Sequence, residues 1–217
     1  MQKILPTLAL ALISAPLLHA AELHVKITDH KGKPVADAVI LAVPTDAKIT
    51  QRGKVPADAI DQVDKQFVPY VKPIPVGATL HFPNSDNIRH QVYSFSPAKK
   101  FELPLYAGTD APPVVFDKPG VVVLGCNIHD WMIGYIYVSD TPFFAKTGAA
   151  GTATLNDMPA GEYTVRVWHP NMERTEESTA QRVSVAPDSP ASAEWRIELK
   201  PAIRVPRVSG ASSPAYP

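Results

Sequence analysis

The sequence predicts an all-β protein, and three observations lead to this prediction. Proline is abundant, with 23 residues in a chain of 217, and proline is excluded from helix interiors. Apolar residues rarely recur at helical spacing, whereas short runs of alternating apolar and polar residues appear along the whole chain. Turns rich in glycine, proline, asparagine and aspartate separate these runs, which is typical of β-sandwiches.

The composition limits the size of the fold and the kinds of partner. A chain of this length suits one or two domains with a sizeable core. Lysine plus arginine and aspartate plus glutamate number 21 each, so no overall charge favours nucleic acid. The single cysteine, Cys126, excludes an intramolecular disulfide. In an exported protein it is then a reactive thiol, an intermolecular partner or a metal ligand.

The N-terminus has the pattern of a secretory signal. A short basic start, Met1–Lys3, precedes the uncharged stretch Ile4–Leu18, and Ala20 and Ala21 offer a cleavage site. The apolar stretch is shorter than the roughly 20 residues of a membrane span, although an uncleaved anchor is the alternative. We expect residues 1–20 to be a signal peptide, the mature chain to have no transmembrane segment, and its location to be periplasmic in a Gram-negative source.

Strands are expected on both sides of a central unit that begins near residue 57. The prolines of Val68–Val76 confine that segment to an edge or irregular strand. A polar linker without periodicity is expected at 45–54, a loop-like region at 101–119, a connection at 140–151 and a disordered tail at 201–217. Alternation or short apolar runs predict strands at 23–27, 38–43, 80–82, 92–95, 114–116, 121–124, 135–138, 152–155, 161–168, 182–185 and 194–199.

The stretch Gly120–Val138 carries the clearest chemical signal. Two predicted strands flank a loop in which Cys126, His129 and Met132 follow each other at intervals of three. A thiolate, an imidazole and a thioether on one tight loop form a soft donor set, which selects copper over magnesium or calcium. Zinc is disfavoured, because a structural zinc site needs four strong nitrogen or sulfur ligands. The alternative is that Cys126 is a small buried apolar residue and Met132 fills the core.

A copper site of the electron-transfer type needs a second histidine. His90 lies where a polar turn, marked by Asn84 and Asp86, leads into a strand, and we expect it to be this ligand. His81 is the competitor, but its position within a short strand is more typical of an exposed histidine. The predicted ligands of one copper ion per chain are therefore His90, Cys126, His129 and Met132.

These segments resemble the cupredoxins, or type 1 blue copper proteins. The motifs are Phe82-Pro-Asn84, Phe116–Gly120 and the loop that starts at Cys126, and its short spacing is most similar to amicyanin. The resemblance covers about residues 58–138 and implies a Greek-key β-sandwich with three equatorial ligands and Met132 as the axial one. One difference is Gln91, because many small cupredoxins have a bracing asparagine there. A backbone N–H to the cysteine sulfur would survive that change.

The flanking segments resemble a different kind of domain. Leu23–Val43 is similar to the opening of carboxypeptidase regulatory-like, transthyretin-type sandwiches, and Gly151–Val165 is similar to a later part of them. The predicted organisation is a sandwich formed by 21–56 and 140–200, split by a cupredoxin at 57–139. The alternative is two unrelated flanks packed on the copper unit. This layout resembles that of exported proteins labelled methylamine utilisation proteins, which implies electron transfer.

The leading functional hypothesis is a periplasmic one-electron carrier with a transient, unidentified redox partner, rather than an enzyme. Trp131 and Ile133 are candidates for an apolar docking patch. Copper storage or delivery is an alternative, although the chain has no methionine- or histidine-rich tract. A second alternative is a copper enzyme that has an open axial position and uses Asp86 or Asp130 as its base. The last alternative is an interaction module in which the copper site is vestigial.

Overall fold

The computed structural model describes residues 21–47, 49, 58–109, 111–187 and 189–201. Its elements are β-strands and one short 3-10 helix, η1 (Glu176–Thr179), so the predicted all-β class is confirmed. Within this described part, no helix is long and apolar enough to cross a membrane. The predicted signal peptide, the boundary at residues 56–57, most of the predicted linker and the tail beyond residue 201 lie outside the described residues.

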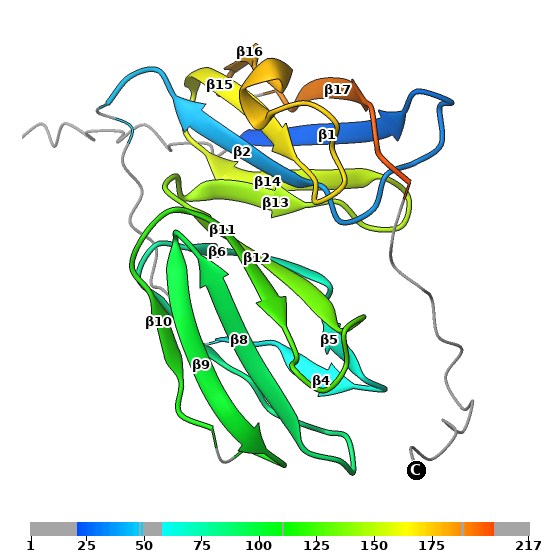
Figure 1. Ribbon diagram of the computed structural model, residues 1–217. Coiled ribbons are helices and arrows are strands. Elements are labelled where there is room, and N and C mark those ends of the chain that lie inside the picture. Colours follow the sequence, from blue (N-terminus) through cyan, green and yellow to red (C-terminus); the bar gives the residue numbers. More distant parts are fainter. Residues whose placement is uncertain (1–20, 48, 50–57, 110, 188, 202–217) are drawn as a thin grey trace, which may run out of the picture.

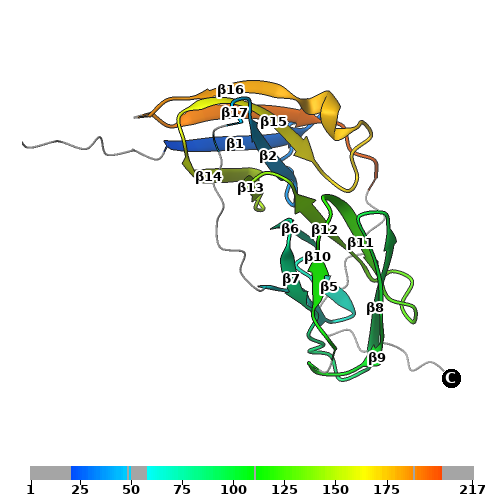
Figure 2. The same cartoon turned by 90° about the vertical axis from the view of Figure 1, so that its left-hand side faces the viewer.

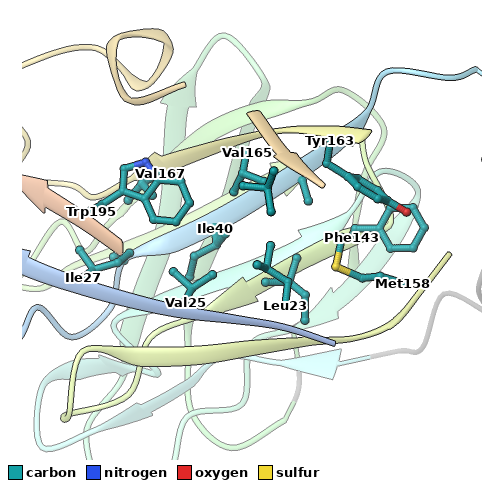
Figure 3. Packing of buried hydrophobic residues seen from close by; sticks show 14 of the residues in the cluster. Leu23, Val25, Ile27, Ile40, Phe143, Met158, Tyr163, Val165, Val167 and Trp195 are labelled. Carbon is teal, nitrogen blue, oxygen red and sulfur yellow. The ribbon is translucent and has the colours of Figure 1, made fainter. Parts of the chain in front are cut away.

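One β-sandwich is built from the two ends of the described chain. Its two sheets have the orders β14-β1-β17 and β13-β2-β15-β16. Alternation in β1 places Leu23, Val25 and Ile27 on one buried face, where they pack with residues such as Val165 of the opposite sheet and Trp195 of the neighbouring strand β17 (Figure 3). The strands are β1 (Ala21–Asp29), β2 (Val39–Pro44), β13 (Phe143–Lys146), β14 (Thr152–Met158), β15 (Gly161–Trp168), β16 (Gln181–Val185) and β17 (Ala191–Ile197).

The segment between β2 and β13 forms a second sandwich, drawn below the first in Figure 1. Its sheets have the orders β6-β12-β11-β8-β9 and β10-β7-β3, and β4 and β5 form a separate hairpin. Phe82, Phe116 and Leu124 belong to its fully buried core. The strands are β3 (Asp58–Ala59), β4 (Asp61–Val63), β5 (Gln66–Val68), β6 (Val71–Pro75), β7 (Ala78–His81), β8 (His90–Ser96), β9 (Lys99–Tyr106), β10 (Val114–Phe116), β11 (Gly120–Gly125) and β12 (Ile133–Ser139).

The expected loop at 101–119 was partly wrong, because residues 99–106 form β9. This strand pairs with β8, and the pairing shifts register between His90 and Val92. Such an irregularity breaks the period of two, so the buried residues of β9, Leu103 and Tyr106, are three apart. The expected connection at 140–151 likewise contains the short strand β13. The prediction of an edge strand is confirmed, since β6 pairs only with β12.

The two sandwiches are joined by an apolar contact. Val39 and Leu41 of β2 pack in one buried cluster with Val71 of β6 and Tyr137 of β12. The ring centroid of Trp168 lies 5.4 Å from that of Tyr137, which extends the same contact. Figure 2 shows the second sandwich extending from this joint, with β12 leading directly toward the first sandwich.

A polar group adjoins this contact. The hydroxyl of Tyr137 donates a hydrogen bond to Oε2 of Glu176 at 2.6 Å, and Nε of Arg166 lies 3.3 Å from Oε1 without hydrogen-bond geometry. Burial raises the pKa of the Glu176 carboxyl above its ordinary value of 4.5, although Tyr137 and Arg166 act in the opposite direction. Burial and the neighbouring Glu176 also raise the pKa of Tyr137, which keeps its hydroxyl as a donor.

Glu176 should make the stability of the joint depend on pH. The pKa of Glu176 is higher in the folded chain than in the unfolded chain, where it is near 4.5. The contribution of Glu176 to stability is therefore complete below the unfolded pKa and is lost as the pH rises through the folded pKa. Urea unfolding at a series of pH values should therefore show wild type losing stability relative to Glu176→Gln as the pH rises. The control is Glu177→Gln, which keeps Glu176 and should therefore lose stability as wild type does, because the Glu177 carboxyl is exposed and its pKa is lowered. Equal slopes in both variants would contradict the assignment.

Gly134 should be required for packing in the second sandwich. A Cβ at this position of β12 would lie 2.8 Å from Cβ of the buried Phe67. We expect Gly134→Ala to lower the free energy of unfolding by about 1–3 kcal/mol, the usual cost of an overpacked core. Gly148→Ala is the matched control, since its Cβ would meet nothing within 4 Å. Chemical denaturation curves of the two variants would test this, and equal stabilities would refute it.

Candidate metal centre

Two local structures position the candidate ligands. The first is the turn before β8, and His90 is the first residue of that strand. The second is the β11–β12 hairpin, which pairs antiparallel from Gly120 opposite Val138 to Gly125 opposite Ile133. The hairpin loop, residues 126–132, carries the other three predicted ligands. The backbone N–H of Met132 donates to the carbonyl of His129 at 2.9 Å, which closes the loop.

The structure brings three of the predicted ligands into one cluster. Nδ1 of His90 and Nδ1 of His129 each lie 3.8 Å from Sγ of Cys126, and the three ligand atoms lie within 4.8 Å of one another. His90 and Cys126 are buried, while His129 is partly exposed. Met132 is also buried and lines the same pocket as Cys126. The competitor His81 is exposed on β7 and does not belong to the cluster.

Asp86 orients the buried His90. Nε2 of His90 lies 2.7 Å from Oδ2 of Asp86, and the same carboxylate accepts the backbone N–H groups of Asp64 at 2.7 Å and Lys65 at 2.9 Å. A carboxylate at Nε2 holds the ring proton there and leaves the Nδ1 lone pair directed at Cys126. Burial lowers the pKa of His90, but its hydrogen bonds with Cys126 and Asp86 outweigh burial and raise it above 6.5.

A buried polar network supports the turn that carries Asp86. Oδ1 of Asn84 accepts the backbone N–H of Asp86 at 3.0 Å, and Nδ2 of Asn84 donates to the carbonyl of Tyr106 at 2.9 Å. The fully buried Gln62 donates from Nε2 to the Tyr106 hydroxyl at 2.6 Å. From the sequence, Asn84 and Asp86 were predicted as turn residues and Asp86 also as a candidate base, but neither was predicted to support His90. The sequence offered no signal for Gln62, because its partners are distant in the chain.

Backbone amides surround the sulfur of Cys126. Burial raises the pKa of this thiol, but His90 and the backbone N–H groups of Gln91 and Ile128 lower it to a net value below 9.0. The contribution from the backbone N–H of Gln91 agrees with the expectation that a backbone N–H serves the sulfur although glutamine replaces asparagine there. The side chain of Gln91 does not brace the ligand loop, since its Nε2 donates to Glu102 at 2.6 Å.

The donor set fits copper better than zinc. A thiol with lowered pKa and two imidazole Nδ1 atoms converge on one point, and a buried thioether lies in the same loop. These are the ligand types of electron-transfer copper sites. A structural zinc site would need a fourth strong nitrogen or sulfur donor, and the residues described in the structure place only three histidine, cysteine or acidic ligands together here.

No family model matches the chain, and no curated protein matches it. Among solved structures, part of the chain is similar to a copper-containing nitrite reductase from Thermus scotoductus SA-01, at 28% identity and a TM-score of 0.37 over 45% of this chain and 25% of that one. It is also similar to a purple cupredoxin from Nitrosopumilus maritimus, at 27% identity and a TM-score of 0.34 over 39% of this chain and 100% of that one. It is similar as well to an oxidized amicyanin variant, at 19% identity and a TM-score of 0.35 over 48% of this chain and 99% of that one. This chain thus spans about a quarter of the length of the nitrite reductase chain.

Asp86 should contribute to metal affinity although it is not itself a ligand. Asp86→Ala removes the acceptor at His90 Nε2, and loss of such a partner typically costs about 10–100-fold in affinity. Competition with a chelator of known copper affinity would measure the change. Gln91→Ala is the control, since it removes only a side chain bonded to Glu102 and retains the backbone N–H. Equal affinities of Asp86→Ala and wild type would show that Asp86 does not orient the ligand.

Proposed function

We propose that this protein is a type 1 copper protein that acts as a one-electron carrier. The observation that carries the proposal is the convergence of Nδ1 of His90 and Nδ1 of His129 on Sγ of Cys126. These three residues, together with Met132, would hold one copper ion per chain. Copper bound there would supply a one-electron couple between Cu(II) and Cu(I).

The protein's own contribution is a rigid set of ligands. His90 is held by Asp86, which is itself tied to the backbone of residues 64 and 65. Cys126 is held by two backbone N–H groups and by the paired ends of β11 and β12. These contacts limit how far the ligand side chains can move when the charge of a bound metal changes. Electron transfer is faster when the ligands keep their positions.

We propose that a redox partner docks where His129 approaches the surface. His129 is partly exposed, and its ring centroid lies 5.2 Å from that of Trp131. Ile128, Trp131 and Ile133 expose 48%, 37% and 40% of their surface. Together they offer an apolar rim suited to the small, transient contacts of electron-transfer proteins.

We further propose the wider setting of this site. Residues 57–139 form the cupredoxin domain, inserted in a carboxypeptidase regulatory-like sandwich made of 21–56 and 140–200. The apolar joint between two separate cores supports this division. Residues 1–20 are a signal peptide that directs the protein to the periplasm. The same proposal includes a role in methylamine utilisation, because exported proteins that this layout resembles carry that label.

The enzymatic alternative has less support from the site. Asp86, one of the two candidate bases, uses its carboxylate on His90 and two backbone amides. Met132 is buried, as an axial ligand should be. Asp130 is exposed, so it lacks the burial that commonly tunes a catalytic base.

Visible absorption and EPR spectra of residues 21–217 after addition of Cu(II) would test the proposal. We expect an intense thiolate-to-copper band and a narrow hyperfine splitting. Cys126→Ala should abolish the band but stay folded, because the loop lies at one end of its sandwich. His81→Ala is the matched control and should leave the spectrum nearly unchanged, since His81 is exposed. A weak band with normal splitting, or copper lost with His81, would reject the ligand assignment.

A further inference from the structure

A pocket of about 370 Å³ lies beside the candidate centre. It opens between β8, β11 and the ligand loop, and Cys126 and Met132 line it. Both residues are almost fully buried, so they form its inner end. Neither His90 nor His129 lines this pocket. It therefore approaches the sulfur donors along a different path from the partly exposed His129.

The pocket wall leads to the residue before the cysteine. A Cβ at Gly125 would lie 2.7 Å from Cζ and 2.8 Å from Oη of Tyr93, so the phenol rests directly on this glycine. The ring centroid of the exposed Phe95 lies 5.2 Å from that of Tyr93. Val123 and Ile133, both exposed, complete the apolar part of the wall. The pocket thus runs from the sheet surface to Cys126 and Met132.

The charge of the pocket selects among possible occupants. Asp130 is the one charged residue among the described residues that line it, and it is exposed. A single carboxylate with low-dielectric walls attracts cations and repels anions. The thiol and thioether at the inner end are soft donors, which favour a cuprous ion over hard cations. An anion would find no positive partner among these lining residues.

We propose that this pocket is the route by which a cuprous ion reaches the empty centre during metal loading. Asp130 attracts the cation at the mouth, and the sulfur atoms of Met132 and Cys126 receive it at the inner end. The thiol proton leaves to solvent as the metal binds. This inference rests on the proposed function, because it assumes that the cluster takes copper. It adds a role for Asp130, which is not a ligand.

Charge-selective labelling of Cys126 in the metal-free protein would test the route without copper. Two methanethiosulfonates of similar size carry either a trimethylammonium or a sulfonate group. With each, the thiolate forms a disulfide with the reagent's thioethyl sulfur and methanesulfinate leaves. The measured quantity is the rate of Cys126 labelling by the cationic reagent divided by the rate with the anionic reagent. We expect this ratio to fall about three- to tenfold in Asp130→Asn, and we expect the difference from wild type to shrink at high salt.

Two further variants complete the labelling test. Asp157→Asn removes an exposed carboxylate on β14, far along the chain from the pocket, and should leave the ratio unchanged. Val123→Lys places a positive charge on the pocket wall at a position that is 42% exposed, and should lower the ratio further. If Asp130→Asn and Val123→Lys both keep the wild-type ratio, the pocket is not the route to the thiol.

Loading with the metal itself is the second measurement. Cuprous ion is supplied anaerobically as its acetonitrile complex, and the reaction is quenched with N-ethylmaleimide, so that mass spectrometry counts the unprotected Cys126. Asp130→Asn should load about three- to tenfold more slowly but reach the same final occupancy. Equal loading rates in wild type, Asp130→Asn and Asp157→Asn would overturn the proposal. If wild type takes up no copper, the proposed function fails, while the labelling ratios still show whether the pocket selects cations.

Discussion

The hydrogen bond between His90 and Asp86 is the contact on which the candidate centre depends. It holds the proton on Nε2 of a fully buried imidazole, so that Nδ1 faces the cysteine. The carboxylate is in turn held by backbone amides of the β4–β5 turn. The side chain of Asn84 links the backbone N–H of Asp86 to the carbonyl of Tyr106 in β9. The ligand geometry is therefore linked to several elements of the sandwich, which makes it a property of the fold and not of one loop.

The joint between the sandwiches leaves that geometry undisturbed. β12 starts at Ile133, next to the ligand loop, and ends at Ser139, close to the first sandwich. A strand of this length spans about 20 Å, so the apolar contact around Tyr137 and the Glu176 carboxyl lie at the opposite end from the candidate ligands. The contact with the first sandwich thus leaves the end of the second sandwich that carries the candidate ligands uncovered, with His129 partly exposed there.

The candidate centre has two distinct approaches from solvent. Around His129 the surface exposes the apolar residues Ile128, Trp131 and Ile133, which would suit the proposed transient contact with a redox partner. The pocket beside Cys126 and Met132 instead has a carboxylate at its mouth and soft donors at its inner end. An apolar rim suits a protein, whereas a negatively charged pocket suits a small cation. On the proposals above, the first surface would serve docking of a redox partner and the second would serve entry of a cuprous ion.

The sequence by itself determined the all-β class, because alternation and turn residues are local patterns. The alternation of Leu23, Val25 and Ile27 with polar residues, for example, indicates a strand whichever segments it pairs with. It also pointed to the residues that the structure clusters, since Cys126 and His129 share one short loop and His90 begins a strand after a polar turn. Only the tertiary structure showed the role of Asp86, the buried Gln62 and the strand β9. Gln62 bonds to Tyr106, 44 positions away, and β9 owes its irregular pattern to the register shift with β8. Contacts between segments that are distant in the chain produce no periodic pattern in the sequence, so they could be identified only in the folded structure.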